Sequence, residues 1–182
     1  MLSRFTWTNW AKGKVLKHNK GFWQGEHHGY KPVKHKRTVM MLDSDRWLVV
    51  DNLISNESHH YALHWLLNDS EVQELATENG LILMPSDSTY WASELSDTKI
   101  LILTGLVDGN GIFSIVRADL NSTRGWRSRY YGYKEPAISM MLEATQTRVT
   151  FWTFFGFQGD AFEVDGKLFK MGSQVINLDE IK

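Results

Sequence analysis

Apolar and polar residues alternate along many short stretches of this chain, and a period of two is the signature of β-strands. In the segment 33–42, His35, Arg37, Val39 and Met41 share one side, and the residues between them share the other. Such stretches recur at about the 8–12-residue spacing that is typical of a β-sandwich or barrel. No segment predicts a helix of three or more turns. We therefore predict an all-β fold, an antiparallel β-sandwich of about 10–13 strands in one domain over residues 1–182.

The clearest hairpin joins residues 38–42 and 46–53 through the acidic turn 43–45. We expect polar turns at 12–14 and 52–58, and a loop or irregular edge at 26–34. Segment 60–67 predicts a strand, although a helix would also bring His60 and His64 together. Further strands are expected at 5–8, 22–25, 88–93, 99–104, 111–118, 137–143 and 148–155, and in a hairpin over 161–171.

The composition is that of a globular protein, with 42% hydrophobic and 23% charged residues among 182. There is no cysteine, which excludes disulfides and thiolate metal sites. The first ten residues alternate and contain no apolar core of a secretory signal, and no run approaches the ~20 apolar residues of a membrane helix. The compartment is left open, and we expect no membrane partner.

Charge is unevenly distributed although the net charge is only −1. Residues 1–37 contain nine Lys or Arg and one acid, Glu26, whereas residues 38–123 contain three Lys or Arg and thirteen acids. A basic segment with interleaved aromatic residues suits an anionic polymer. A solvated face, or a surface that pairs with an acidic neighbour, explains the same pattern equally well.

Histidines mark the first candidate site, because all seven precede residue 65. His27 and His28 stand in a polar segment that ends at Tyr30. A neutral imidazole there could act as a base or bond a sugar hydroxyl, and it could equally bond backbone carbonyls. Adjacent residues of an extended chain point to opposite faces, so His27 and His28 are not expected to share a metal.

His35 and Arg37 form a second candidate, since they share a strand face at a spacing of ~7 Å. The guanidinium could bind a carboxylate or sulfate through two parallel hydrogen bonds. Alternatively, both side chains could pair with an acid of the protein such as Asp51.

A third candidate is the segment 124–133, where arginines and aromatic residues alternate. Trp126, Arg127 and Tyr131 could contact an anionic glycan there. Single-stranded nucleic acid would suit the same residue types, but the chain is not basic overall and has no nucleic-acid motif, so we expect no such partner.

No pattern in the sequence defines a catalytic, metal or cofactor site. His60 and His64 would lie ~13 Å apart on a strand, too far to share a metal, and no H-E-x-x-H pattern occurs. Nucleophile elbows, phosphate loops and dinucleotide fingerprints are absent as well. We therefore assign no catalytic residue, no metal ligand and no cofactor.

Several motifs together resemble the C-terminal region of heparinase II/III-like proteins. They are W-Q-G-E-H-H-G-Y from Trp23, P-V-x-H-x-R from Pro32, W-L-V-V-D from Trp47, H-Y-A-L-H-W-L-L from His60 and G-W-R-S-R-Y-Y-G-Y-K-E-P-A from Gly125. The resemblance covers most of the chain, from about residue 5 to about residue 155. It implies a β-sandwich of the supersandwich type, which in that family follows an α-helical toroid.

The resemblance also implies a polysaccharide-lyase parent that cleaves uronate-containing chains by β-elimination. Much of that family's apparatus lies in the toroid, and its sandwich contributes an H-x-H-x-D-like segment and an A-H-N segment, neither of which occurs in these 182 residues. We therefore expect a C-terminal sandwich portion that is inactive alone and that supports binding of an anionic polysaccharide. A stand-alone carbohydrate-binding module and a structural or oligomerisation domain are the alternatives. Expected protein partners are an α-toroid domain, or a second copy joined through sheet edges.

Overall fold

A computed structural model describes residues 11–76, 78–84 and 99–181, and in this part of the chain it contains strands and no helix. None of the described residues forms a helix that is long and apolar enough to span a membrane. The strands are β1 (Gly13–Asn19), β2 (Phe22–Tyr30), β3 (Val33–Asp43), β4 (Arg46–Leu67), β5 (Glu71–Glu74), β6 (Gly80–Met84), β7 (Ile100–Leu106), β8 (Ile112–Arg117), β9 (Trp126–Arg127), β10 (Glu135–Pro136), β11 (Ile138–Phe157), β12 (Phe162–Asp165), β13 (Leu168–Met171) and β14 (Gln174–Asn177).

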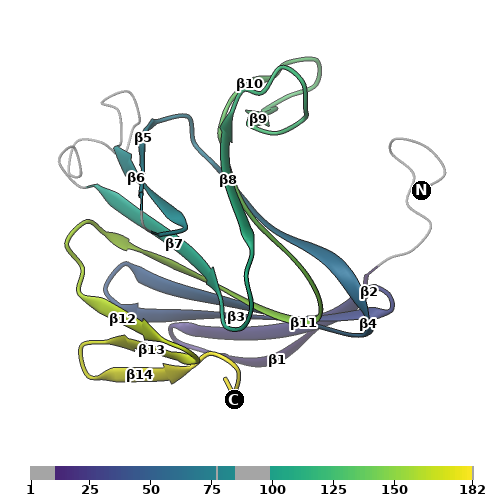
Figure 1. Cartoon of the computed structure of the whole chain (residues 1–182), viewed down its shortest axis with the longest axis vertical. Helices are drawn as coiled ribbons and strands as arrows, with labels where there is room; N and C mark the ends of the chain where they lie inside the picture. The colour runs from purple at the N-terminus through teal and green to yellow at the C-terminus, as the bar shows by residue number, and fades with distance from the viewer. Residues whose placement is uncertain (1–10, 77, 85–98, 182) are drawn as a thin grey trace.

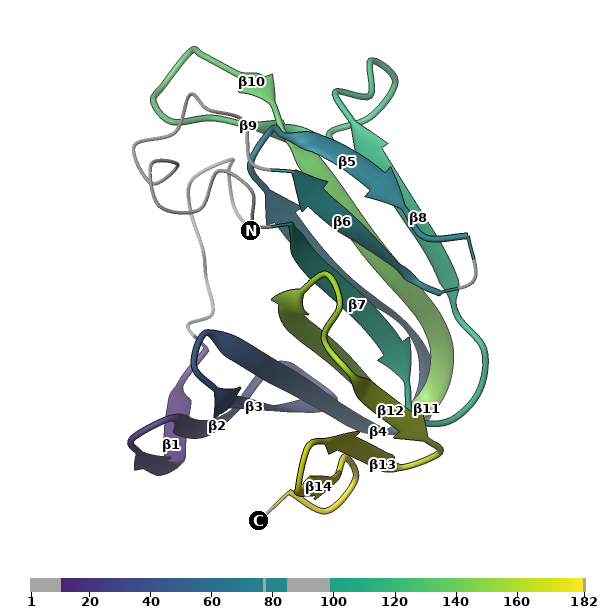
Figure 2. The same cartoon turned by 90° about the vertical axis from the view of Figure 1, so that its left-hand side faces the viewer.

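Two long strands, β4 and β11, form the centre of the main antiparallel sheet. The strand order is β1-β2-β3-β4-β11-β7-β6-β5, and β8 pairs with the first part of β11 while β7 pairs with its second part. Figures 1 and 2 show β4 and β11 curving from the layer that contains β1–β3 to the layer that contains β8. These two strands therefore connect both layers of the sandwich.

The bend in β4 corrects two expectations from the sequence. Residues 52–58 are not a chain reversal, and segments 137–143 and 148–155 are not separate strands, because β4 and β11 pair along nearly their full lengths. His59 pairs with Gln146 and Ile54 with Arg148, so the polar residues 55–58 lie opposite Thr147 alone. This segment is a bulge, which bends a strand and increases its twist without ending the pairing.

Three groups of buried side chains fill the interior. One lies between the main sheet and the small sheet β12-β13-β14, where Phe154 and Phe169 are fully buried. The second surrounds Phe151 and Leu142, and the third joins β6 and β7 to Ile138 and Met140. The all-β sandwich predicted from alternation is thus confirmed.

Other local expectations divide between confirmed and corrected. The hairpin β3–β4, the strand at 60–67 and the hairpin β12–β13 are confirmed. Residues 13–14 and 26–30 are strand rather than turn or loop, because β1 pairs with β2 and β2 with β3. The described residues form fourteen strands, more than the predicted number, since β9 and β10 are two-residue strands. The strands predicted at 5–8 and 88–93 lie outside the described residues.

Candidate functional site

A pocket of about 410 Å³ lies where β4 bends between its two halves. Tyr30, His35 and Arg37 line it from β2 and β3, and residues 59–64 line it from the second half of β4. Asp51 lies at its base, on the first half of β4. The site is therefore built by the hairpin β2–β3 and by the bend in β4.

The carboxylate of Asp51 organises this pocket, with only 3% of its side chain exposed. Arg37 donates from Nε to Oδ1 at 2.6 Å and from Nη2 to Oδ2 at 2.9 Å. His35 Nε2 lies 2.6 Å from the same Oδ1. Arg37 is directly opposite Asp51 in the β3–β4 ladder, which makes the bidentate pair a cross-strand contact. The sequence left open whether His35 and Arg37 bind an anionic ligand or pair with an acid of the protein, and in the structure both contact Asp51.

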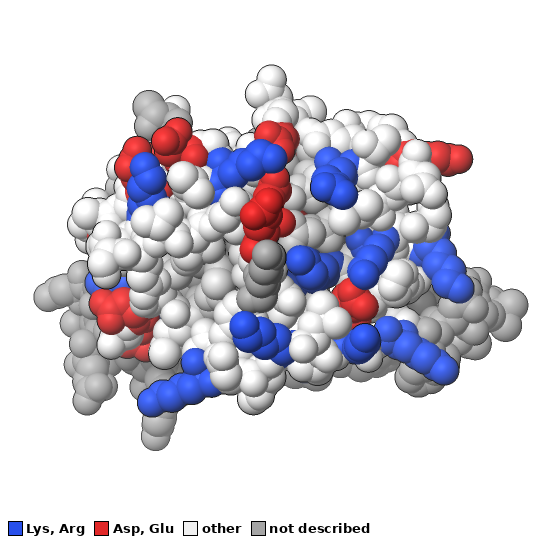
Figure 3. Space-filling view, turned by 90° about the horizontal axis from the view of Figure 1, so that it is seen from below, with Lys and Arg blue, Asp and Glu red and all other residues white. Residues whose placement is uncertain are grey.

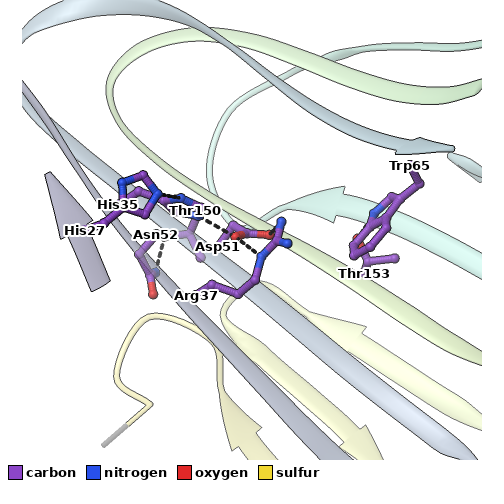
Figure 4. Close-up of polar contacts among 8 residues, drawn as sticks. All are labelled: His27, His35, Arg37, Asp51, Asn52, Trp65, Thr150 and Thr153. Carbon is purple, nitrogen blue, oxygen red and sulfur yellow. Dashed lines mark hydrogen bonds and ion pairs between the residues drawn. The ribbon is translucent and has the colours of Figure 1, made fainter. Parts of the chain in front are cut away.

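A directional chain of hydrogen bonds leads from the backbone of β2 to Asp51, and Figure 4 shows its part from His27 to Asp51. The Gly29 amide donates to His27 Nδ1 at 3.1 Å, so His27 carries its proton on Nε2 when neutral. His27 Nε2 lies 3.0 Å from His35 Nδ1, which must then accept. His35 is left with its proton on Nε2, where it donates to Asp51. Neutral imidazoles in these tautomers satisfy every contact in the chain.

The electrostatics of the site agree with this arrangement. Burial lowers the pKa of His27, and the nearby His35, His28 and Arg37 lower it further by repulsion. Burial acts to raise the pKa of Asp51, but the hydrogen bonds from His35 and Arg37 outweigh it, so its pKa lies below the ordinary value. Neutral His27 and ionised Asp51 are therefore the favoured states near neutral pH.

The chemical consequence is that His27 and His35 have no ring nitrogen left for a proton transfer. All four nitrogens take part in the chain described above. A general base needs a free lone pair within hydrogen-bond reach of its substrate. These two histidines therefore position Asp51 and Arg37.

Aromatic side chains surround the polar centre. The Tyr30 ring stacks on His35 with centroids 6.2 Å apart, and its edge contact with His27 is 4.9 Å. The Arg37 guanidinium lies over the Trp65 ring, 5.4 Å from its centroid. Trp65 is held in place because its Nε1 donates to Thr153 Oγ1 at 3.0 Å (Figure 4). Arg37 thus bridges the carboxylate and an aromatic face.

The other predicted residues lie apart from this pocket. His28 is exposed and does not line the pocket. The face of Trp126 is covered by Lys134 Nζ, 4.0 Å from the ring centroid, and its Nε1 donates to the Asp119 carbonyl. His28 lies on β2, whereas Trp126 belongs to the hairpin region β9–β10, which Figure 1 shows at the upper end of the molecule.

Arg127 and Tyr131 of that region differ sharply in accessibility. Arg127 binds the Glu135 carboxylate at 2.5 Å and the Asn68 side chain. Tyr131 is 97% exposed, at a distance from the histidine pocket. The structure therefore brings together His27, Tyr30, His35 and Arg37, and separates them from Trp126, Arg127 and Tyr131.

Three contributors to the site were missed in the sequence, two that line the pocket and one that packs beside it. Trp65 stacks with Arg37, and His59 and Tyr61 line the wall. The Tyr61 hydroxyl is buried without a hydrogen-bond partner among the described residues, and burial raises the pKa of Tyr61. Alternation along 60–67 indicated that Tyr61 and Trp65 share one face of the strand. Only the bend in β4 brings that face to the side of the sheet where Asp51 lies. Among the described residues, no group of three or more His, Cys, Asp or Glu could hold a metal ion.

The fold and the pocket define this chain as a β-sandwich with an aromatic and histidine-rich recess. The family model for "Heparinase II/III-like, C-terminal" matches residues 1–163, and the chain belongs to that family. No match was found among curated proteins.

Solved structures with a similar fold include heparinase III and a heparan sulfate lyase. Two heparinase III structures match with a TM-score of 0.65, at 14% and 18% sequence identity over 86% and 89% of this chain. The heparan sulfate lyase HepC from Pedobacter heparinus matches with a TM-score of 0.60 at 16% identity over 84% of the chain. This chain spans only about a quarter of the length of those proteins, between 23% and 24%.

Proposed function

We propose that this chain is the C-terminal β-sandwich portion of a heparinase II/III-like polysaccharide lyase and is non-catalytic alone. It supports binding of an anionic, uronate-containing polysaccharide by the parent protein. The observation that carries the proposal is the pocket in the bend of β4, where a guanidinium, a phenol and several imidazoles converge. Family membership supports the lyase parent, and the geometry of the pocket supports the binding role.

The pocket has the chemistry that a sugar acid requires. The exposed aromatic face of Tyr30 suits the apolar face of a pyranose, and arginine suits its carboxylate. Asp51 occupies Nε and Nη2 of Arg37, which leaves Nη1 outside that pair. A uronate carboxylate is expected to meet Nη1, so that it need not displace Asp51. The engagement of both histidines in the hydrogen-bond chain that ends at Asp51 supports a non-catalytic role for them.

The protein partners expected from the sequence remain part of the proposal. Docking to an α-toroid domain would complete the architecture of the parent lyase. Association of two copies through sheet edges is less favoured by β1, because lysines on an edge strand oppose edge-to-edge pairing. Lys14 and Lys17 lie on that strand.

Calorimetry with polygalacturonate oligosaccharides tests the binding role. Tyr30→Ala should weaken binding about tenfold, because it removes a 62%-exposed ring from the pocket wall. Tyr131→Ala, the same change at the remote hairpin, is the matched control and should bind like the wild type. Ultraviolet absorbance should detect no unsaturated uronate when the chain is incubated alone with the polymer.

Two results would overturn the proposal. Unsaturated products formed by this chain alone would contradict its non-catalytic role. Loss of binding through Tyr131→Ala, with Tyr30→Ala unaffected, would move the site to the β9–β10 hairpin and favour a stand-alone binding module. Circular dichroism of each variant separates a binding defect from a folding defect.

A further inference from the structure

A second surface with strong charge lies on the opposite face of β1–β4. Across neighbouring strands, Lys14 pairs with Glu26, Glu26 with Lys36, and Lys36 with Asn52. Directly paired residues point to the same face, so this row is continuous across four strands. The next row on the same face joins Lys34, through Ile54, to Arg148 of β11. We name Lys14, Lys34, Lys36 and Arg148, with Glu26 among them, the basic face.

The basic face is separate from the pocket because successive residues of a strand point to opposite sides. Lys34 and Lys36 alternate with His35 and Arg37, which line the pocket. Figure 3 shows the lower side of the molecule, where Lys and Arg side chains surround a small acidic area on the right of the view. A ligand on the basic face would therefore not touch the histidine pocket.

Acidic neighbours compensate only part of this charge. Lys34 Nζ lies 2.6 Å from Glu26, and Lys34, Lys14 and His28 all lower the pKa of Glu26. Lys36 and Arg148 form no ion pair within the described part of the chain. Repulsion among cations held on one rigid sheet costs free energy that a bound anion would relieve.

A hollow of about 160 Å³ lies between these two cations. Lys34, Lys36 and Arg148 surround it, and Asn52, Ile54 and Thr150 also line it. Its volume equals that of roughly five waters, enough for one sulfate or carboxylate group. Asp179 lines the hollow as well, but its carboxylate is held by Lys167 Nζ at 2.5 Å and by Thr150 Oγ1 at 3.2 Å. The polar residues are bonded too, since Asn52 Nδ2 donates to Thr150 Oγ1 at 3.0 Å.

We infer that the basic face binds an anionic polysaccharide through its sulfate or carboxylate groups, independently of the pocket. Four strand spacings separate Lys14 from Arg148, so the cations extend over ~19 Å. This spread suits a polymer with repeated charges better than a single small anion. A polysaccharide is favoured over single-stranded nucleic acid because no exposed aromatic residue of this row offers a stacking platform for bases. The inference rests on the charge of this face and not on the proposed pocket function.

Salt-dependent binding to dextran sulfate, polygalacturonate and neutral dextran tests the inference. Lys36→Glu/Arg148→Glu should reduce affinity for a charged polymer at least tenfold. Lys99→Glu/Lys134→Glu changes the net charge equally at remote positions and should retain wild-type affinity within about twofold. In Lys36→Gln/Arg148→Gln, the plot of log affinity against log salt should become less steep by about two units. Each lost cation contact releases about one counterion fewer.

Each alternative outcome has a definite meaning. Equal losses of affinity in Lys36→Glu/Arg148→Glu and Lys99→Glu/Lys134→Glu would show that only the net charge matters, and would overturn the proposed site. Tighter binding to duplex DNA than to either acidic polysaccharide would overturn the ligand class. If Tyr30→Ala abolishes polymer binding and Lys36→Glu/Arg148→Glu does not, this inference fails while the pocket function stands. Urea denaturation of each variant confirms that the fold is intact.

Discussion

At the scale of single residues, the buried charge of Asp51 determines which contacts matter. Its partner Arg37 is 37% exposed at the side chain, whereas Asp51 is 3% exposed. Removal of the guanidinium takes two hydrogen bonds from a carboxylate that is almost completely buried, and leaves His35 as its remaining side-chain donor. The pair is therefore asymmetric, and the loss of Arg37 is the damaging event.

We expect Arg37→Ala to lower the free energy of unfolding by about 3–5 kcal/mol, the usual cost of breaking a buried ion pair. The matched control is Arg117→Ala, which removes an equivalent bidentate contact to Asp69 at 2.6 and 2.8 Å. That pair is exposed, so its loss should cost no more than about 1 kcal/mol. Urea denaturation measures both, and equal losses would contradict the role given to burial.

The histidine chain predicts that stability falls in mild acid. The pKa of His27 in the folded protein lies below its ordinary value of about 6.5, so the unfolded chain binds more protons in that range. Stability from this group is fully present above pH ~6.5 and is lost as the pH falls through the lower, folded pKa. Protonation would also break the bond from the Gly29 amide to His27 Nδ1.

His27→Gln should flatten this pH dependence, and His28→Gln should preserve it. His28 is the exposed neighbour and the matched control. Urea midpoints measured between pH 7.5 and 5.0, around the ordinary imidazole pKa of about 6.5, give the comparison. Identical slopes for the wild type and His27→Gln would show that another group senses the acid.

At the scale of strands, two glycines allow indole rings to lie flat on the sheet. A Cβ at Gly105 would approach the ring of Trp152 to 2.5 Å, and one at Gly25 would approach the ring of Trp23 to 2.6 Å. Trp152 is buried in the core, whereas Trp23 is 37% exposed. A Cβ on Gly105 of β7 would therefore meet the fixed ring of Trp152 on β11, whereas one on Gly25 would meet the movable ring of Trp23 on the same strand, β2.

Gly105→Ala should cost about 1–3 kcal/mol, because a packed core cannot move aside without strain. Gly25→Ala should cost less than about 1 kcal/mol, because Trp23 can turn toward solvent. Thermal and urea denaturation give the comparison. A larger loss in Gly25→Ala would mean that Trp23 is fixed more firmly than its exposure indicates.

The sequence predicted local pairing better than the long-range arrangement of strands. Alternation in 33–42 located the β3–β4 hairpin, which places Arg37 opposite Asp51, and the sequence had offered pairing with Asp51 as one of two alternatives for His35 and Arg37. The polar segment 55–58 has the same composition as a turn. Only pairing with β11, far along the chain, makes it a bulge. The contact of Trp65 with Arg37 depends on that bend and was therefore not predictable from local pattern.

At the scale of the whole molecule, the segment beyond the family match completes the core. The family model ends at residue 163, yet Phe169 and Leu178 are fully buried in the main hydrophobic cluster. Phe169 packs on Phe154 and Trp152 of β11, with ring centroids 5.5 and 6.4 Å apart. The small sheet β12-β13-β14 therefore covers one face of the central strands.

Phe169→Ala should lower the free energy of unfolding by about 3–5 kcal/mol, as expected for loss of a large core ring. Val175→Ala, at a 62%-exposed position of β14, should change it by no more than about 0.5 kcal/mol. Chemical denaturation distinguishes the two. A small effect of Phe169→Ala would show that the small sheet is dispensable for the core.

The ladder between β4 and β11 has a consequence for biosynthesis. Its partners, such as Trp47 and Phe155, lie on the order of 100 residues apart in sequence, and such non-local pairing is slow to form. At about 5–20 residues per second, β4 leaves the ribosome on the order of ten seconds before β11. During that interval β4 presents an unpaired edge to other chains. The yield of folded protein in cells should therefore depend on translation speed and on chaperones that shield β4.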